Sequence, residues 1–334
     1  MQISRRSFAI AAVAAGMLLT APASATFAAE TDQVTIRYLS SQGGLSAHEL
    51  ADALGYFKDT GVTVKDVGYA PGGPASLFAL ASGNVEVGGA ATAAVLNSIA
   101  GGNDFVAAYP SNGIDKTTES IFYSLDGSPI KSIKDLAGKT IAVNTLGAHL
   151  DYTVREALHS VGLPENSAKL VVVPGPQLEQ VLRSKQVDVS AFGYWQKTYE
   201  GVALKSGGLQ KIFGDTDVLG EIAGGFTVLR RDWIKQHPQA AKIFIEKSQV
   251  ALEYARVHPE ETKAVIAKVL ASRGENADIA QYFTGYGVRE GGKAVPRDLQ
   301  FWIDILARGG VLKPGQLKAE DILYDPANFA VAGN

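Results

Sequence analysis

Hydrophobic and polar positions follow two alternating patterns along the chain. Short runs rich in β-branched residues, such as residues 34–39, are typical of buried strands. Longer stretches with apolar residues three and four apart, such as residues 46–57, indicate amphipathic helices. Strands that alternate with helices predict a parallel sheet with right-handed crossovers. The pattern therefore predicts an α/β protein.

The same order of elements occurs twice. In the first half we expect strands at residues 34–39, 62–67, 85–89 and 105–109, and helices at 46–57, 74–82 and 92–100. In the second half we expect strands at 139–143, 169–173 and 187–192, and helices at 148–161 and 176–184. A return strand at 224–229 and helices at 238–257, 259–271, 277–283 and 296–307 follow; three of these helices open with proline, which suits a first helical turn.

The repetition extends to single residues. With one gap, Pro74, Leu80, Ser82, Val85 and Val87 align with Pro176, Leu182, Ser184, Val187 and Val189, and Glu86 aligns with Asp188. Coincidence over so short a stretch is the alternative. Because the order of elements also repeats, we favour an internal duplication that builds two similar lobes.

The first 25 residues predict an export signal. Arg5 and Arg6 precede an apolar run at residues 8–19, and residues 23–25 have the small-x-small form of a cleavage site. The run is shorter than the roughly 20 residues that span a bilayer. Residues 4–8 resemble a twin-arginine signal, but the next two residues depart from its usual ending, so the general secretory route also stays open. Both routes lead to the periplasm of a bacterium.

Composition excludes several classes of protein. A chain of 334 residues exceeds what one core usually holds, which favours two lobes. With a formal net charge of −3, the chain has no excess positive charge that would attract nucleic acid. The absence of cysteine excludes disulfides, thiolate metal sites and cysteine nucleophiles. We expect no nucleic-acid partner, no metal and no cofactor.

Glycine-rich polar segments follow the expected strands. They lie at residues 40–44, 71–74, 88–92 and 144–147, where ligands of open α/β sheets bind. Glycine permits close approach of the backbone, and free N–H groups at helix N-termini suit an oxyanion. Ordinary tight turns are the alternative for any single segment. Several such segments at matching places in both halves favour a binding site.

Three ring side chains are candidates for ligand contact. Trp195, beside Tyr194, follows the last strand of the second half, where it would cover the apolar part of a ligand or pack between lobes. His149 lies one turn into a helix and would bond an anion, although a capping or solvated histidine is commoner. We expect His48 on a helix surface and Glu49 in solvent. The chain contains no Gly-x-Ser-x-Gly, His-Glu-x-x-His or phosphate-loop motif, so we expect no enzyme activity.

Four segments resemble a known family. Residues 53–62 (ALGYFKDTGV) and 79–88 (ALASGNVEVG) are similar to the AxxxGxFxxxGLxV and ALxSGxVDxG patterns of nitrate/sulfonate/taurine-type ABC transporter solute-binding proteins. Residues 133–143 are similar to the family's DLKGKKIAV segment, with Ala137 in place of lysine. Residues 186–189 resemble its second GxVDA, with Lys185 in place of glycine. The fold is also related to that of thiamine pyrimidine precursor-binding proteins.

The resemblance implies a type II periplasmic-binding-protein fold. It consists of two α/β lobes joined by two crossover segments, expected near residues 120–123 and 225–228, with C-terminal helices. Residues 34–118 and 223–334 would form lobe 1, and residues 119–222 would form lobe 2. Carried onto this sequence, the family's ligand contacts fall on Ser41, Gln42, Gly73, Thr92, Gly147, Ala148 and Trp195, and His149 lies beside them.

The resemblance also implies a function. A monomer would capture a small anionic ligand (an aliphatic sulfonate, taurine or nitrate) and deliver it to an ABC permease in the inner membrane. Binding of a thiamine precursor or an aromatic acid, or a periplasmic sensory role, stays open. Related pyrimidine-precursor synthases resemble iron-dependent enzymes with a cysteine-rich motif, which a chain without cysteine does not have.

Overall fold

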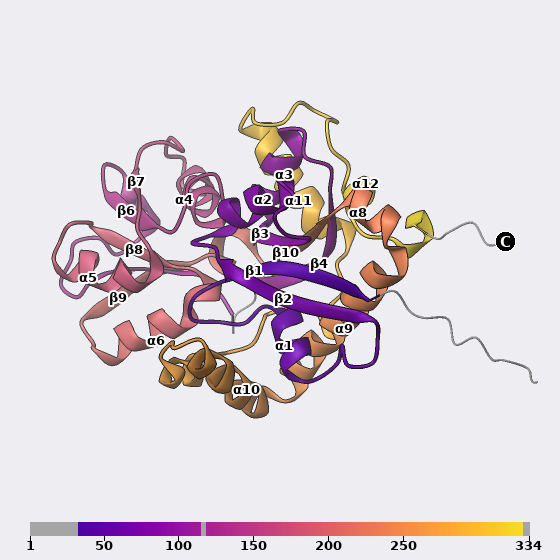
Figure 1. The fold of residues 1–334 in the computed structure, drawn as a ribbon. Coiled ribbons are helices and arrows are strands. Elements are labelled where there is room, and N and C mark those ends of the chain that lie inside the picture. The colour runs from indigo at the N-terminus through magenta and orange to yellow at the C-terminus, as the bar shows by residue number, and fades with distance from the viewer. Residues whose placement is uncertain (1–32, 115–117, 330–334) are drawn as a thin grey trace, which may run out of the picture. The chain divides into compact units, whose positions relative to one another are not determined.

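The computed structural model describes residues 33–114 and 118–329 (Figure 1). The export signal predicted for residues 1–25 lies outside the described residues. Within the described part of the chain, no helix is long and apolar enough to cross a membrane. All of these residues belong to one compact unit.

A first layer of strands is built mainly from the first half of the chain. Strand β1 (Val34–Ser40) pairs in parallel with β2 (Val62–Tyr69). Strand β10 (Ile222–Arg230) pairs antiparallel with β3 (Val87–Ala91) and with β4 (Phe105–Ile114). The N–H of Glu86 donates to the carbonyl of Arg37 at 3.0 Å, so β1 lies beside the start of β3. The order across this layer is β2-β1-β3-β10-β4.

A second layer repeats this order with later strands. The strands of the second layer, in their order across it, are β7 (Lys169–Val172), β6 (Thr140–Val143), β8 (Val189–Phe192), β5 (Ile121–Leu125) and β9 (Leu209–Gly214). Strand β6 is parallel to both of its neighbours, whereas β5 is antiparallel to β8 and β9. The chain crosses from the first layer to the second after β4 and returns to the first layer after β9. Strand β5 therefore follows a first-layer strand but lies in the second layer, and β10 follows second-layer elements but lies in the first layer. The expectation of purely parallel sheets is therefore wrong for these two strands.

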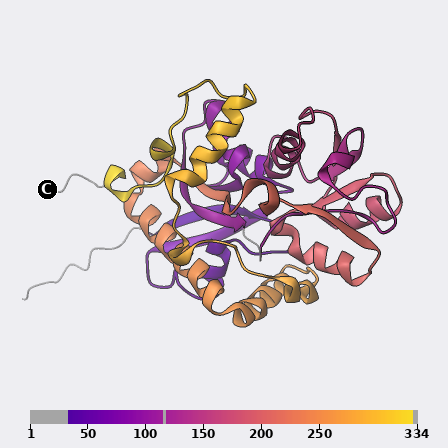
Figure 2. The ribbon, with the colours of Figure 1, turned by 180° about the vertical axis from the view of Figure 1, so that it is seen from behind.

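The helices cover both layers (Figures 1 and 2). The helices are α1 (Ala47–Ala53), α2 (Gly73–Ala81), α3 (Thr92–Ala100), α4 (His149–Ser160), α5 (Leu178–Arg183), α6 (Lys197–Lys205), α7 (Thr216–Leu219), α8 (Arg231–Gln236), α9 (Pro238–Val257), α10 (Pro259–Ser272), α11 (Pro296–Arg308) and α12 (Ala319–Ile322). Short 3₁₀ turns are η1 (Ile133–Leu136), η2 (Gly175–Gln177), η3 (Tyr194–Gln196), η4 (Ala277–Tyr282), η5 (Glu290–Gly292) and η6 (Pro326–Phe329). Helix α6 and strand β9 were not predicted from the sequence.

Two predicted helices differ from the observed ones. The first was expected to extend to residue 57 but ends at Ala53, because Gly55 and Asp59 adopt positive φ angles of 77° and 59° that no α-helix contains. Residues 277–282 form the 3₁₀ turn η4 instead of an α-helix. The three long proline-led helices α9, α10 and α11 start at the predicted residues.

Helix α11 illustrates how the core forms. Its apolar residues recur three and four apart, so Leu299, Trp302, Ile303 and Leu306 share the buried face. They belong to the same apolar cluster as Phe226 of β10. Burying each large apolar side chain stabilises the fold by roughly 1.5–3 kcal/mol. The C-terminal helices are thus part of the first layer's core.

Candidate ligand-binding cavity

A cavity of about 290 Å³ lies where strand ends of both layers meet. The first layer contributes the segments that follow β1 and β2 together with strand β3 itself, and the second layer contributes the segments that follow β6, β7 and β8. These are the carboxyl ends of parallel strands, the edge at which open α/β sheets bind ligands. The strand topology thus brings six segments, distant in sequence, to one place.

Most of the predicted contact residues line this cavity. Ser41 and Gln42 lie in its wall after β1, Gly73 after β2, and Ala148 and Trp195 on the side of the second layer. Contact of these residues with a ligand stays a prediction, whereas their convergence is observed. Tyr194 and Gln196, on either side of Trp195, also line the cavity.

Thr92, Gly147 and His149 do not belong to the cavity lining. The Thr92 hydroxyl is fully buried and donates to the carbonyl of Ala223 at 3.2 Å. The carbonyl of Gly147 accepts a hydrogen bond of 3.0 Å from the side-chain amide of Asn97. These three residues therefore lie outside the observed lining, and the Thr92 hydroxyl and the Gly147 carbonyl are bound by the protein's own groups.

His149 supports the cavity wall from behind. Its Nε2 lies 2.7 Å from Oδ2 of Asp215, and both side chains are fully buried. Oδ1 of Asp215 accepts a hydrogen bond of 2.9 Å from the N–H of Ser120, so Asp215 links His149 to the segment that leads into β5. The imidazole packs edge-on against Tyr194 and Trp195, with ring centroids 5.1 and 6.0 Å away. His149 therefore positions the aromatic wall and does not face the cavity.

Close packing requires two glycines, Gly73 in the wall and Gly193 directly before the lining residue Tyr194. A Cβ on Gly73 would lie 2.5 Å from Cβ and 2.9 Å from Cα of Ala90. A Cβ on Gly193 would lie 2.6 Å from the indole of Trp195. Glycine at these positions lets the segment after β2 contact β3 and lets the indole fold back over its own strand end.

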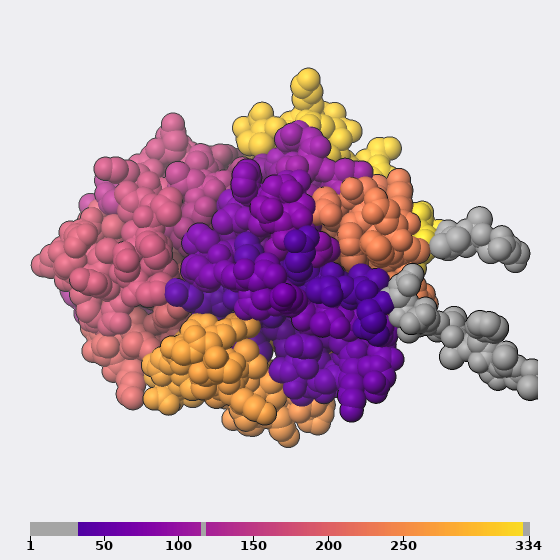
Figure 3. All heavy atoms as spheres, viewed as in Figure 1, coloured from indigo at the N-terminus to yellow at the C-terminus, as the bar shows by residue number. Residues whose placement is uncertain are grey.

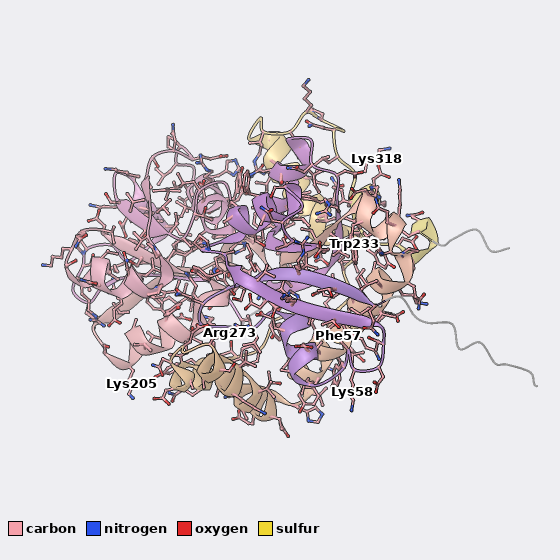
Figure 4. All side chains as sticks on the ribbon, in the orientation of Figure 1. Phe57, Lys58, Lys205, Trp233, Arg273 and Lys318 are labelled. Carbon is pink, nitrogen blue, oxygen red and sulfur yellow. The ribbon has the colours of Figure 1, made fainter. Side chains whose placement is uncertain are left out.

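The loop between β1 and α1 is fixed by a segment from far along the chain. We call residues 41–46 the β1–α1 loop and residues 273–286 the strap. The carboxylate of Glu275 accepts the N–H of Gly43 at 2.7 Å, and the hydroxyl of Tyr286 donates to the carbonyl of Leu45 at 2.9 Å. Arg273, labelled in Figure 4, donates to the carbonyl of Gly44 at 3.5 Å. Three consecutive backbone positions of the loop are thus held by the strap.

The strap also contacts the second layer. A Cβ on Gly201 of α6 would lie 2.2 Å from the ring of Tyr282, so only glycine lets the tyrosine rest on that helix. In Figure 3, the orange helix α10 that leads into the strap lies between the pink second half and the indigo strands. Phe283 and Thr284 line the cavity directly. No sequence pattern indicated this contribution, because the strap is over 200 residues from the loop that it holds.

Glu49 and His48 are buried, and their expected exposure is wrong. The Glu49 carboxylate accepts the N–H and the hydroxyl of Ser46 at 2.6 and 2.7 Å and pairs with Arg273. Burial raises the pKa of Glu49, and the Arg273 charge opposes that shift. His48 is hydrogen-bonded to Ser46 and Tyr109, and burial lowers its pKa to about 3. Serine followed three residues later by glutamate is the sequence form of a capping box, and this signal at Ser46 and Glu49 was missed.

Several backbone amides expected to bind an oxyanion are already bound. Glu275 accepts the N–H of Gly43, Ser76 accepts that of Gly89, Asp151 accepts that of Gly147, and Gln196 accepts that of Gly193. The hypothesis that glycine-rich turns present free amides is therefore wrong at Gly43, Gly89 and Gly147, the three that belong to the predicted segments. Polar side chains must contribute more to ligand binding than the sequence suggested.

The remaining wall is polar and aromatic. Lys197 is a cationic residue of the lining, and its ammonium lies 2.6 Å from the Glu200 carboxylate. Glu200 also accepts the Tyr123 hydroxyl at 2.7 Å. The aromatic residues of the lining are Tyr38, Tyr69, Tyr194, Trp195, Tyr199, Phe283 and Tyr286. Lys197 and Tyr199 were missed in the sequence although they directly follow the predicted Trp195.

The two layers, their exchanged strands and the cavity between the strand ends define a periplasmic-binding-protein fold. The periplasmic aliphatic sulphonate binding protein SsuA from Escherichia coli has a similar structure, with a TM-score of 0.68 and 19% identity over 87% of this chain and 92% of that protein. The alkanesulfonate-binding protein SsuA from Xanthomonas axonopodis pv. citri, bound to MOPS, matches with a TM-score of 0.67 and 19% identity over 87% and 98% of the two chains.

Sequence comparison supplies the family. A protein of Brucella abortus (strain 2308), named as a candidate binding protein, is 23% identical over 244 residues, which are 72% of this chain and 73% of that protein. The model of the NMT1/THI5-like family matches residues 47–262. The chain belongs to the NMT1/THI5-like family.

Proposed function

We propose that this protein is the solute-binding component of an ABC importer and that it binds a small organic sulfonate in the cavity between its two layers. The observation that carries the proposal is the convergence of six segments of the two layers, and of Trp195, on one cavity of about 290 Å³. Both similar structures named above are of sulfonate-binding proteins, and one of them has MOPS bound. A binding role accords with the wall, in which hydroxyls, amides and aromatic rings predominate and the charged groups of Lys197 and Glu49 are paired with Glu200 and Arg273.

The cavity volume favours a sulfonate with an organic body over nitrate. At about 290 Å³, the cavity lies at the lower end of the roughly 300–1,000 Å³ that is typical of pockets for small organic ligands. Nitrate would fill a small part of that volume and leave the aromatic wall without contact. An alkyl or ring body would cover the aromatic side chains, while Lys197 and the polar side chains bind the oxyanion.

The location and the partner are part of the same proposal. The signal-like residues 1–25 and the family resemblance support export to the periplasm. Residues 34–118 with 223–334, and residues 119–222, would act as two lobes that close on ligand and present a joint surface to an inner-membrane permease. The protein would act as a monomer and would need no cofactor.

Titration of the mature chain with defined anions tests the proposal. Ethanesulfonate, MOPS, taurine, nitrate and sulfate would be added while tryptophan fluorescence and the melting temperature are followed. Trp195 is half-buried in the cavity wall, whereas Trp233 and Trp302 are buried outside it. A ligand at 100 times its Kd stabilises the folded state by about 2.7 kcal/mol. A fluorescence change that Trp195→Phe abolishes would place the ligand at this wall.

An aromatic acid is the second candidate ligand. The seven aromatic residues of the lining favour it, because aromatic rings stack on one another in offset or edge-on geometry. Benzenesulfonate, benzoate and an aminopyrimidine belong in the same titration. Tighter binding of benzoate than of any sulfonate would replace the sulfonate proposal, and a folded protein that binds none of these compounds would count against the transport role.

A further inference from the structure

A tyrosine of one layer rests on a glycine of the other layer at two places beside the cavity. The ring of Tyr282, in the strap, lies against Gly201 of α6, where a Cβ would stand 2.2 Å from the ring atom Cδ1. The hydroxyl of Tyr199, in α6, lies 3.0 Å from the place of a Cβ built on Gly43 of the β1–α1 loop. Each layer thus supplies one glycine and one tyrosine, so the two layers fit together closely along α6.

Gly201 is an unfavourable residue for its own helix. It lies inside α6, and its backbone is helical, a conformation that any L-residue adopts. Glycine inside a helix is less stable than alanine, because its backbone loses more conformational freedom on folding. Local structure therefore gives no reason for glycine at this position. The ring of Tyr282 supplies the reason, because it occupies the place that a side chain on Gly201 would take.

The strap holds Tyr282 in place from the side of the first layer. Glu275 and Tyr286, near its two ends, bind the β1–α1 loop. The carbonyl of Tyr286 also accepts the N–H of Gly113 at 2.7 Å, near the end of β4, where the chain crosses to the second layer. A Cβ on Gly113 would lie 1.9 Å from the carbonyl oxygen of Gly287, so this contact is tight as well. The strap therefore extends from the crossover to α6, and both of its ends are fixed.

The contact between Tyr282 and Gly201 is separate from the surface that faces a ligand. Both residues lie outside the cavity lining, although Phe283 and Thr284, which follow Tyr282, belong to it. The 3₁₀ turn η4, which contains Tyr282, packs against α6. A substitution at this contact therefore changes how the two layers meet and leaves the cavity side chains as they are.

We propose that the contact of Tyr282 with Gly201 is a clasp that stabilises the closed arrangement of the two layers and so sets ligand affinity from outside the cavity. The inference rests on the proposed closure of two lobes on a ligand, and it assigns part of the closing free energy to this contact. A ligand that binds only the closed arrangement has an apparent Kd equal to its intrinsic Kd divided by the closed fraction. A weaker clasp lowers that fraction, so affinity falls although no contact with the ligand has changed.

A double-mutant cycle tests the clasp by calorimetric titration with MOPS. Gly201→Ala should weaken MOPS binding about tenfold or more, because the added methyl group meets the Tyr282 ring and forces the layers apart. Tyr282→Ala removes the ring and should weaken binding about three- to tenfold, and Tyr282→Phe, which keeps the ring, should restore it. Gly201→Ala added to Tyr282→Ala should have no further effect, because the methyl group then meets no ring. A further tenfold loss in that double variant would overturn the clasp.

A disulfide across the same contact provides a second test, because the chain contains no cysteine of its own. A Cβ on Gly201 would lie 2.4 Å from Cγ of Tyr282, so the two Cβ atoms lie within the range that a disulfide bridges. The variant with Gly201→Cys and Tyr282→Cys would be loaded with MOPS and then oxidised. It should release MOPS about tenfold or more slowly than the same protein after reduction, because the layers no longer separate at α6. Equal release rates in the oxidised and reduced protein would overturn the clasp.

Small-angle X-ray scattering without ligand separates failure of the clasp from failure of the proposed function. The oxidised double-cysteine variant should have the smallest radius of gyration, Gly201→Ala the largest, and the wild type a value between them. Equal radii for the wild type and Gly201→Ala would overturn the clasp, whatever the ligand is. If the folded wild type binds no sulfonate but the radii follow the expected order, the proposed ligand class fails and the clasp stands.

Discussion

Glu86 and Asp188 make the same pair of backbone hydrogen bonds in the two halves of the protein. The Glu86 carboxylate accepts the N–H of Arg37 at 2.7 Å, and the Asp188 carboxylate accepts the N–H of Thr140 at 2.8 Å. Their own N–H groups donate to the carbonyls of Arg37 and Thr140 at 3.0 and 2.9 Å. The alignment of these two acids in the sequence thus corresponds to an equivalent position in space, which supports the internal duplication.

The turns that precede Glu86 and Asp188 are equivalent as well. The difference between their residues, glycine in one turn and lysine in the other, predicts a stabilising substitution. Gly83 and Lys185 follow their helices with φ angles of 74° and 58°. Lysine is strained in this left-handed region, whereas glycine is not. We expect Lys185→Gly to raise the free energy of unfolding by about 0.5–1 kcal/mol. Urea denaturation would measure it.

The control for that substitution lies at a helix end. Lys205 is exposed and is the last residue of α6, so Lys205→Gly removes the same charge but gains no relief of strain. It should lower the free energy of unfolding by up to about 1 kcal/mol. A loss of stability in both variants would contradict the strain at Lys185.

Gly73 and Gly72 form a matched pair in the cavity wall. A Cβ on Gly73 meets Ala90 at 2.5 Å, whereas a Cβ on Gly72 meets nothing within 4 Å. Gly72 has an extended backbone with φ of 176°, which any residue adopts. Gly73→Ala should cost about 1–3 kcal/mol of stability and weaken ligand binding. Gly72→Ala should change stability by less than about 0.5 kcal/mol. Thermal unfolding and ligand titration of both variants check the contrast.

Glu275 should control the order of the β1–α1 loop. Glu275→Ala removes the acceptor of the Gly43 N–H, and we expect that amide to exchange with deuterium about tenfold faster or more. Glu275→Gln keeps a carbonyl oxygen in the same place and should preserve slow exchange. Site-resolved hydrogen exchange measures this in the ligand-free protein. Fast exchange in the glutamine variant, or slow exchange in the alanine variant, would disprove the role of Glu275.

Stability should depend on pH through His48. Burial lowers the pKa of His48 from 6.5 to about 3, so this side chain stays neutral in the folded state between these values. The unfolded chain takes up a proton as the pH falls through 6.5, and folding stability then decreases by up to about 1.4 kcal/mol per pH unit. His48→Gln should remove that slope between pH 6 and 4.

Urea unfolding at several pH values measures this slope. Burial raises the pKa of Glu49, which acts in the opposite direction, but Glu49 is present in both proteins and largely cancels in the difference. His159→Gln replaces an exposed histidine and should retain the wild-type slope. Equal slopes for the wild type and His48→Gln would show that His48 titrates normally in the folded protein.

The sequence alone determined the order of elements and much of the site. Local hydrophobic periodicity specified most strands and helices of both halves, although not α6 and β9, and the proline-led helices α9, α10 and α11 started where predicted. The rule that strand ends of such sheets bind ligands pointed to the segments that hold Ser41, Gln42, Gly73 and Trp195, and the family resemblance added Ala148. These features depend on short-range patterns, which a sequence displays directly.

Only the tertiary structure decided which groups pair with each other. The ion pair of Glu49 with Arg273 and the hydrogen bond from the N–H of Gly43 to Glu275 both join residues far apart in the chain. His149 likewise turned away from the cavity because Asp215, 66 residues later, is its partner. Such pairings depend on which surfaces pack together, and no local pattern encodes the residue on the opposite surface.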